Sequence, residues 1–447
     1  MTSQTPSVPS EIVRPAPRRQ PRPTGKRPAV AGPLKALVGP RTLQQALDQA
    51  VSPQRRREIA QQSGYDAQAQ KLTFEPYLRA LVVRQLVGGS LHDLQHGMAH
   101  DPLYAAHGAR MEISVPALSK ANAQRPSQAF WDVVAEVMAA IDALPQTVRI
   151  GRPQPLGAAT PKALREIGQV LEHTQIFDAT TLTLPPQIAR WARTSTKRER
   201  AGIKVQLRLR AGYGGIDRVM VTGAKGNDNP YFCALLDLES ATPGQLYLFD
   251  TGYCKLATYD AIREHGSDLV TILHESIKVE VVEERPVLTP ETSQGYTLHS
   301  DRLVRLGTGK TRSPHLWRLI DATDTQGQRR TILTSLLEES AERITQLRAY
   351  RWTIEIVFRW LKGVLQLETL ISVSPAGIAM QVAVALIVYG VLLLYHAGGA
   401  LSLKALQRRV KTELHGAIFA AGVAEGRRQE RVRTASGPAL PRLRAVG

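Results

Sequence analysis

The spacing of apolar residues predicts an N-terminal helical part of the chain. Apolar positions recur every three or four residues over residues 41–50, 76–87 and 127–144, which is typical of amphipathic helices. Ser127 begins the third run and is a residue type that caps helix N-termini. We therefore expect residues 41–145 to form a helical region, here interpreted as DNA-binding.

From about residue 170 the pattern changes to that of strands. Residues 202–210 read GIKVQLRLR, and this alternation of apolar and basic residues predicts a half-buried strand. Residues 217–222 and 246–249 also predict strands. Between them, residues 229–237 predict the start of a helix. Residues 170–277 are therefore expected to alternate strands with helices.

The C-terminal half combines a β-rich stretch with long helical runs. Residues 278–334 contain β-rich runs separated by turn residues, and the pattern is helical from 335 to Leu370. The apolar run at 378–397 has about the length of a membrane span. It contains Gln381 and His396, and long charged segments precede it, so a buried core helix is favoured. No association with a membrane is expected.

Both ends of the chain are basic. Residues 1–40 contain nine Pro and seven Lys or Arg beside one acid, Glu11, and such a segment cannot bury enough apolar surface to fold. It is expected to be a disordered basic arm that contacts phosphates, or a plain solvated tail. Residues 401–447 predict a second basic tail, with six Arg among the last 23 residues.

The composition indicates a polyanionic partner and excludes two kinds of site. Lys and Arg total 57 against 39 Asp and Glu, a net charge of +18, which favours nucleic acid or an anionic membrane surface as a partner. The two cysteines, Cys233 and Cys254, exclude a disulfide scaffold and a Cys-rich zinc site and suit a reducing cytosol. The N-terminus has no apolar region typical of a secretory signal, so a cytoplasmic location is expected.

Three acidic residues are candidates for catalysis. Asp178 and Asp250 each follow an apolar strand pattern, at the place where ligand sites gather in α/β sheets. An Asp at a strand end is also a common turn former or helix cap. With Glu355, these residues would supply the carboxylate oxygens that Mg²⁺ or Mn²⁺ prefers. Two such ions would suit phosphodiester chemistry.

Glu355 lies in a helical pattern that is rich in basic residues. The four bases near it are Arg348, Arg351, Arg359 and Lys362. One interpretation is a ladder of ion pairs along a solvated helix face. The surplus of bases over acids favours instead a surface that binds an anionic ligand.

Around these acids the chain resembles the bacterial DDE transposases of the insertion-sequence-four group. The motifs are Asp178-Ala-Thr-Thr, Asp250-Thr-Gly-Tyr253 and Arg351-Trp-Thr-Ile-Glu355. The group's third motif is Tyr, two residues, Arg, three residues, Glu, six residues, Lys. Arg351, Glu355 and Lys362 follow these spacings. The resemblance covers roughly residues 110–397.

The chain departs from the group's pattern at two positions. Arg348 stands at the Tyr position of the third motif, and Tyr350 lies two residues later. Thr251 stands in the second motif where the group usually has Arg. These departures bear on the activity of this copy more than on its membership of the group.

The resemblance implies an α/β fold with an RNase H-like core, a mixed five-stranded sheet flanked by helices. In the group, a β-rich insertion separates the second Asp from the Glu. The stretch at 278–334 is expected to be this insertion, and residues 335–400 are expected to complete the core with helices.

The resemblance also implies cut-and-paste transposition. Asp178, Asp250 and Glu355 would hold two Mg²⁺ ions, with Mn²⁺ possible. The partners would be double-stranded DNA, both terminal inverted repeats and target, and a second copy of the chain in a synaptic homodimer. The protein would associate with the nucleoid. The expected DNA contacts are Tyr253, Arg348, Tyr350, Arg351, Arg359 and Lys362.

Further residues are weaker candidates for DNA contact. Lys120 and Arg125 lie in a segment between predicted helices that suits either a helix-turn-helix reader or an ordinary helical pair. Lys204 would line a DNA path or a solvated face. Trp317 would stack on a flipped base or belong to the core. Two other functions remain open: a non-catalytic DNA-binding protein derived from a transposase, and a nuclease that cuts without joining.

Overall fold

The computed structural model describes most of the chain between residues 42 and 396. The described residues are 42–144, 170–186, 189–195, 200–212, 214–225, 228–287, 290–292 and 295–396. The basic arm expected over 1–40 and the tail expected over 401–447 lie outside the described residues.

The described residues before the first strand include seven helices. These are α1 (Leu43–Ala50), α2 (Pro53–Gln62), α3 (Phe74–Val87), α4 (Leu91–His100), α5 (Pro102–Ala106), α6 (Val115–Gln124) and α7 (Gln128–Asp142). Polar side chains fix where several begin. The hydroxyl of Ser90 accepts a hydrogen bond from the backbone N–H of Asp93, and the Asp93 carboxylate accepts one from the backbone N–H of Ser90, a reciprocal cap that starts α4.

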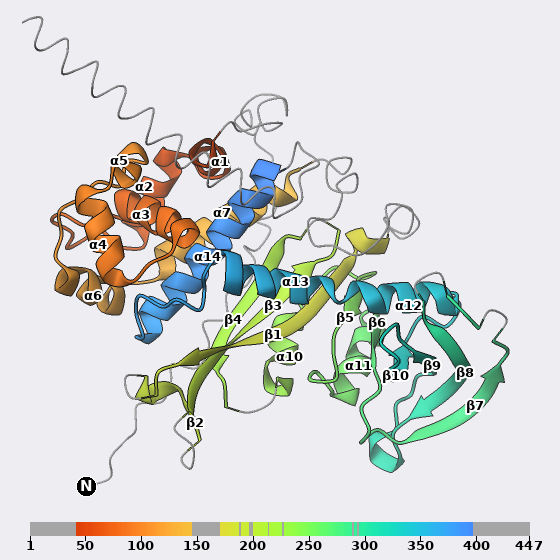
Figure 1. Cartoon of the computed structure of the whole chain (residues 1–447). Helices are drawn as coiled ribbons and strands as arrows, with labels where there is room; N and C mark the ends of the chain where they lie inside the picture. Colours follow the sequence, from red (N-terminus) through yellow and green to blue (C-terminus); the bar gives the residue numbers. More distant parts are fainter. Residues whose placement is uncertain are drawn as a thin grey trace, which may run out of the picture.

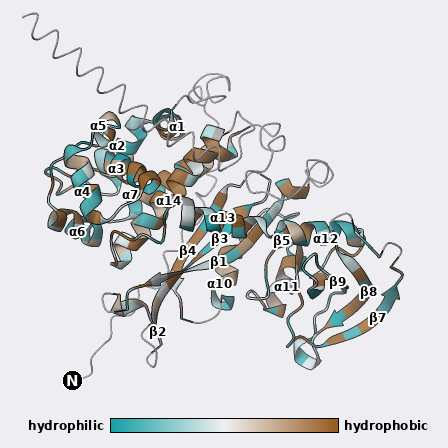
Figure 2. Cartoon of the chain, viewed as in Figure 1, coloured by the Kyte–Doolittle hydropathy of each residue, from teal (hydrophilic) through white to brown (hydrophobic). Residues whose placement is uncertain are grey.

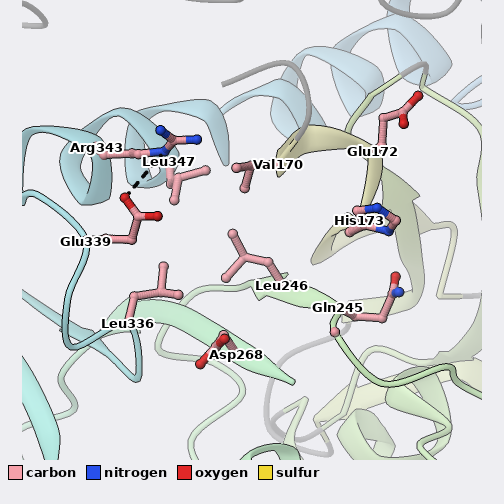
Figure 3. A pocket seen from close by; sticks show the side chains of 11 residues that line it. Val170, Glu172, His173, Gln245, Leu246, Asp268, Leu336, Glu339, Arg343 and Leu347 are labelled. Carbon is pink, nitrogen blue, oxygen red and sulfur yellow. Dashed lines mark ion pairs between the residues drawn. The ribbon is translucent and has the colours of Figure 1, made fainter. Parts of the chain in front are cut away.

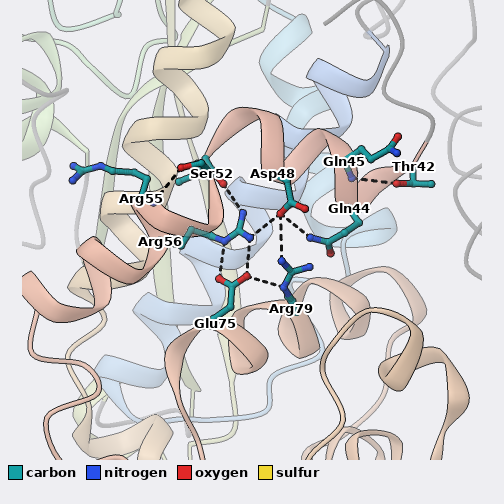
Figure 4. Close-up of polar contacts among 10 residues, drawn as sticks. Thr42, Gln44, Gln45, Asp48, Ser52, Arg55, Arg56, Glu75 and Arg79 are labelled. Atoms are coloured by element: carbon teal, nitrogen blue, oxygen red, sulfur yellow. Dashed lines mark hydrogen bonds and ion pairs between the residues drawn. The ribbon is translucent and has the colours of Figure 1, made fainter. Parts of the chain in front are cut away.

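A network of charged side chains ties the first three helices together (Figure 4). Arg56 of α2 is fully buried, and its Nη2 lies 2.7 Å from both Asp48 of α1 and Glu75 of α3. Arg79 of α3 contacts the same two carboxylates at 3.3 and 2.7 Å. A buried charge is costly unless it is paired, so this network requires the three helices to keep their relative positions.

Helix α14 (Pro375–His396) comes from the far end of the described chain and lies among the N-terminal helices, in contact with α1, α3, α6 and α7 (Figure 1). It is hydrophobic along most of its length (Figure 2). The run Pro375–Tyr395 is long and apolar enough to cross a membrane, but it is buried inside the protein. The apolar run at 378–397 therefore forms a core helix, as the sequence pattern favoured.

One large sheet forms the centre of the remaining chain. Its strands are β1 (Thr174–Leu184), β2 (Arg193–Ser195), β3 (Arg200–Arg210), β4 (Ile216–Gly223), β5 (Leu246–Leu248), β6 (Asp268–Ile272), β7 (Val279–Arg285), β8 (Thr297–Leu306), β9 (Trp317–Thr323) and β10 (Arg329–Thr334). Their order is β2-β3-β1-β5-β6-β10-β9-β8-β7, and β4 pairs with β3. β1, β5 and β6 are parallel to one another, and the other pairings are antiparallel.

The sheet is larger than the five strands that the resemblance implies, so a separate five-stranded sheet is not confirmed. The strands β7 to β10 come from the β-rich stretch at 278–334. They extend the sheet because β10 pairs with β6, with Ile332 opposite Ile272. The edge of β6 is thus hydrogen-bonded to the next strand instead of ending the sheet.

Helices cover the two faces of the sheet. Along β1, successive side chains point to opposite faces. Ile176 packs in the same cluster as Ile354 of α13 (Thr353–Arg359), whereas Phe177 packs with Phe232 of α10 (Asn229–Leu236). α12 (Ala341–Tyr350) contacts β6 and β10, and α11 (Leu256–Glu264) contacts β6. Figure 1 shows α12 and α13 running along one side of the strands and α10 and α11 on the other.

Candidate active site

The register of two strands brings Asp178 and Asp250 to the same edge. β1 and β5 are parallel, and Ile176 lies opposite Leu248. Each Asp is the second residue after this pair, so the two side chains leave the same face. β1 continues to Leu184, so the prediction that Asp178 ends a strand is wrong. What ends beside Asp178 is the pairing with β5.

Glu355 approaches this edge from the helical layer. The helical run predicted up to Leu370 is broken, because α12 ends at Tyr350, α13 begins at Thr353, and a π-helical segment, η4 (Trp360–Val364), follows. α13 contacts β1. Glu355 in the first turn of α13 therefore lies over the strand that carries Asp178.

The three acids meet at one guanidinium. Arg351 lies between α12 and α13, and its Nη1 donates to Asp178 Oδ2 at 2.9 Å. Its Nη2 donates to Glu355 Oε1 at 2.5 Å and lies 3.7 Å from Asp250 Oδ2. Arg351 is only 5% exposed. The pair Arg351–Glu355 has helical spacing, but its burial and its contact with Asp178 rule out a solvated ladder.

Burial and the arginines shift the acids in opposite directions. Burial raises the pKa of Asp178 to about 6, against the opposing effect of Arg351. Burial also acts to raise the pKa of Asp250, but Arg351 and Arg348 outweigh it, and the pKa lies below its usual value. Burial would lower the pKa of Arg351, but Asp178 and Asp250 outweigh it and raise this pKa. The guanidinium of Arg351 therefore stays charged.

Arg348, at the motif position where the resemblance expects Tyr, faces the second acid. Its Nη2 lies 3.6 Å from Asp250 Oδ1. Burial and the neighbouring Arg351 lower its pKa to about 10, so it remains a cation at neutral pH. Tyr350 lies inside the protein, and its hydroxyl donates to the carbonyl oxygen of Ala211 at 2.9 Å. Its contact with DNA stays a prediction.

Tyr253 lies beneath the loop that carries Asp250. Its side chain is buried, with its ring centroid 5.3 Å from that of Phe232. Its hydroxyl donates to Gln206 Oε1 at 3.5 Å, and its carbonyl oxygen accepts from Tyr259 at 3.0 Å. In this arrangement Tyr253 supports the loop from inside, and its contact with DNA stays a prediction.

Two bases extend from the acids along the helical layer. Arg359 is exposed at the end of α13, one turn beyond Glu355. Lys362 follows in η4, and its Nζ donates to the carbonyl oxygen of Thr181 at 2.8 Å and lies 3.6 Å from Glu368. Both lie on the segment that leads away from the carboxylates, and their contact with DNA stays a prediction.

Lys204 lies on the opposite face of the sheet. Asp178 pairs with Leu207 across β1 and β3, so these two side chains share a face, and Lys204 points the other way. Its Nζ forms an ion pair with Asp228 Oδ1 at 2.9 Å. The structure does not bring Lys204 together with the three acids.

Lys120 and Arg125 belong to the N-terminal helices. Both line a cavity of about 810 Å³ between α6 and the connection from α2 to α3. Arg125 lies over the ring of Tyr65, with its guanidinium carbon 5.2 Å from the ring centroid, and donates to the carbonyl oxygen of Leu72. These two residues lie apart from the carboxylates.

Trp317 belongs to the core. It is fully buried in β9, and its Nε1 donates to Ser313 Oγ at 2.8 Å. Of the two interpretations of this residue, the core position is the observed one.

Asp228 is a neighbour of the site that sequence reasoning missed. It precedes α10 and pairs with Lys204. Its Oδ2 lies so near the Asp250 loop that a Cβ on Gly252 would be 3.4 Å from it. The only signal in the sequence is its place in a polar, glycine-containing stretch, and such stretches are common in turns.

A second cavity lies at the other end of the parallel strands (Figure 3). It has a volume of about 540 Å³ and is lined by residues at the starts of the strands, among them His173, Leu246 and Asp268, together with Arg343 of α12. The predicted site residues do not line it. The candidate chemistry is therefore concentrated where the strands end, not where they begin.

The three acids fit a divalent metal ion in their donor chemistry. All are carboxylates, the ligand type that hard divalent ions prefer, and all face one positive group. Within the described residues, no three His, Cys, Asp or Glu side chains are grouped so that they could hold a metal ion as they stand. In this structure the guanidinium of Arg351 lies among the three carboxylates.

The comparisons with known proteins identify the domain that contains these residues. Residues 172–391 match the family described as "Transposase DDE domain". The chain carries a DDE transposase domain. The match includes Asp178, Asp250 and Glu355. The protein is thus a transposase, an enzyme that uses divalent metal ions to cleave DNA and transfer its strands.

Two relatives are also named as transposases. The transposase is 26% identical over 297 residues to a transposase from Sinorhizobium fredii (strain NBRC 101917 / NGR234). These 297 residues cover 64% of this chain and 75% of the relative. It is 24% identical over 348 residues to a transposase from Geobacillus stearothermophilus that is named for an insertion sequence element. These 348 residues cover 78% of this chain and 83% of that relative. A solved piggyBac transposase synaptic complex with hairpin DNA has a TM-score of 0.43 and 12% identity, over 92% of this chain and 85% of that one.

Proposed function

We propose that this transposase moves an insertion sequence by cut-and-paste transposition, in the manner of the insertion-sequence-four group, with Asp178, Asp250 and Glu355 as its catalytic residues. The observation that supports this most is the meeting of the three carboxylates at Arg351, at 2.9, 3.7 and 2.5 Å. Since they come from a strand, a loop and a helix, their convergence gives one place where a single phosphodiester would react.

The three carboxylates would hold Mg²⁺, two ions in the complete site, with Mn²⁺ also suited. Metal bound there would activate the attacking oxygen and stabilise the leaving oxygen. The transposase would first cleave at the ends of the element. The freed 3′-OH would then attack the opposite strand or the target DNA.

The chain's own bases would position the DNA. Arg348 and Arg351 lie at the carboxylates and would bind phosphates beside the cleaved bond, where a guanidinium can form two parallel hydrogen bonds. Arg359 and Lys362 would continue this contact along α13 and η4. The exposure of Arg359 and the partial exposure of Lys362 support the proposal. Tyr253 would act from inside, by holding the loop of Asp250.

The strand order supports an RNase H-like unit within the larger sheet. The run β4-β3-β1-β5-β6 has two antiparallel pairings followed by two parallel ones, and this pattern supports the proposal of a mixed five-stranded unit of the kind that the resemblance implies. The strands β7 to β10 would be the insertion. The proposed division is 1–40 arm, 41–145 helical DNA-binding region, 170–277 and 335–400 core, 278–334 insertion, and 401–447 tail.

The proposed partners are the terminal inverted repeats and the target DNA, together with a second copy of the chain in the synaptic complex. Lys120, Arg125 and Lys204 would add DNA contacts away from the carboxylates. The charge of +18 supports a polyanionic partner. The protein would act in the cytoplasm, at the nucleoid.

An excision assay tests this function. A marker is placed between the DNA segments that flank the gene, the protein is supplied separately, and the wild type is compared with Glu355→Gln, which keeps the size of the side chain and removes its charge. We expect excision by the wild type alone. Excision by both proteins would contradict the carboxylate assignment. Excision by neither, with the flanking DNA still bound, would favour a non-catalytic DNA-binding protein.

A further inference from the structure

Arg351 occupies the point where the three carboxylates converge. It is almost fully buried, and its two terminal nitrogens contact all three acids. Its remaining nitrogen, Nε, has no hydrogen-bond partner among the described residues. Within the described part of the chain, the hydrogen bonds and ion pairs of the guanidinium are therefore those to the carboxylates.

The carboxylates need a cation at this point. Three negative groups held this close repel one another unless positive charge lies between them. Arg351 supplies one positive charge at the centre, and Arg348 adds a second at 3.6 Å from Asp250. A divalent ion would satisfy the same carboxylates better, but it cannot bind all three while the guanidinium is there.

We propose that Arg351 is a switch with two positions. In the protein without DNA it holds Asp178, Asp250 and Glu355 and thereby excludes divalent metal. In the DNA complex it turns to a backbone phosphate and leaves the carboxylates to the metal. This inference rests on the proposed function, because it takes these three acids as the metal-holding residues.

The chemistry of the guanidinium allows the exchange. A phosphate offers the guanidinium the same bidentate geometry as a carboxylate. When Arg351 moves from the acids to DNA, its hydrogen bonds to carboxylate oxygens are therefore replaced by hydrogen bonds to phosphate oxygens. Arg351 also lies between two helices, not inside one, and its long side chain can reach either partner. The metal then enters only where DNA is present.

The switch makes DNA and metal assist each other. DNA binds Arg351 and so leaves the carboxylates free for the metal. Metal binds the carboxylates and so leaves Arg351 free for the DNA. Such coupling is reciprocal, and values of roughly five- to 150-fold are common. Removal of the guanidinium should abolish the coupling and raise metal affinity in the absence of DNA.

The test measures binding of Mn²⁺ to the full chain, by the electron paramagnetic resonance signal of the free ion. The affinity is measured with and without a duplex from the DNA that flanks the gene. We expect Arg351→Gln to bind Mn²⁺ roughly tenfold more tightly than the wild type without DNA. The duplex should raise the affinity of the wild type by a similar factor and leave that of Arg351→Gln unchanged.

Two further variants make the test specific. Arg343→Gln removes the same charge from α12, where the side chain contacts Glu339 at 3.6 Å, and it should bind Mn²⁺ like the wild type. Arg351→Lys keeps the charge but has one nitrogen in place of two, so it should give an intermediate affinity. It also serves if Arg351→Gln fails to fold, which circular dichroism would report.

The outcomes separate this inference from the proposed function. If Glu355→Gln weakens Mn²⁺ binding in the presence of the duplex, while Arg351→Gln binds Mn²⁺ like the wild type in its absence, the carboxylate site stands and the switch is wrong. If Asp178→Asn and Glu355→Gln both bind Mn²⁺ like the wild type when the duplex is present, the carboxylate site itself is wrong. If the duplex raises the affinity of Arg351→Gln as much as that of the wild type, the coupling does not pass through Arg351.

Discussion

Arg351 Nη1 lies 2.9 Å from Asp178 Oδ2, although 173 positions of the chain separate the two residues. This ion pair joins the break between α12 and α13 to the middle of β1. Because the same guanidinium contacts Glu355 and approaches Asp250, one side chain organises the whole candidate site. The activity of the transposase should therefore depend on this small group of residues more than on the cavities elsewhere.

Asp178→Asn should abolish DNA cleavage while the protein stays folded and bound to DNA. The change keeps the size of the side chain and removes a charge that metal needs, so we expect the cleavage rate to fall by roughly a thousandfold or more. Cleavage of an end-labelled duplex from the flanking DNA measures this. Asp268→Asn is the matched control, because Asp268 lies at the start of β6, at the other end of the parallel strands. Equal cleavage by both variants would contradict the role of Asp178.

Lys362→Ala should weaken DNA binding by about the same factor for every DNA sequence. A lysine that contacts one phosphate contributes about one unit to the slope of log affinity against log salt concentration. We expect the variant to lose about one unit of this slope in a titration series from low to moderate salt. Lys278→Ala changes an exposed lysine far along the chain from η4 and should keep the slope. An unchanged slope in Lys362→Ala would place the lysine outside the DNA path.

Asp217→Asn should destabilise the fold. The Asp217 side chain is 7% exposed and contacts Arg208 at 2.7 Å and Arg210 at 3.0 Å. Loss of one partner of a buried ion pair leaves the other charge uncompensated, at a cost of about 3–5 kcal/mol. Urea unfolding of the two proteins measures the difference. A loss below about 1 kcal/mol would mean that water reaches the arginines.

The same residue should make stability depend on acid pH. Burial acts to raise the pKa of Asp217, but Arg208 and Arg210 outweigh it, and the pKa lies below its usual value of 3.8. A lowered carboxylate pKa stabilises the fold above pH 3.8, and this contribution is lost as the pH falls through the folded-state pKa. The difference in free energy of unfolding between wild type and Asp217→Asn should therefore shrink below about pH 4. A constant difference would contradict the assignment.

Gly390→Ala should destabilise the packing of α14 against α7. A Cβ at this position would lie 2.5 Å from Val137 Cγ1 and 3.3 Å from Met138 Cε, so the two helices would have to separate. Overpacking of this kind costs about 1–3 kcal/mol, which thermal unfolding would show as a lower midpoint. Gly363→Ala is the control in a helical segment, because its Cβ would have no atom within 4 Å. An equal midpoint for both variants would mean that α14 tolerates the added methyl.

Local patterns predicted several elements correctly. The alternation at 202–210 lies within β3, and the helix expected over 229–237 is α10. The spacing of Arg351 and Glu355 placed these side chains one turn apart, as the ion pair between them requires. Such features depend on neighbours along the chain, so the order of residues alone carries them. α11 and β6 were missed, because their periodicity is short and mixed.

The sequence by itself determined the apolar core helix, the candidate acids and the family to which their motifs point. Only the tertiary structure decided that Arg351 reaches Asp178, that Tyr253 is turned inward, and that β10 extends the sheet beyond β6. The reason is physical. Periodicity records which face of one element is apolar, whereas these contacts depend on strand register and packing between distant segments, and no local pattern specifies how distant segments meet.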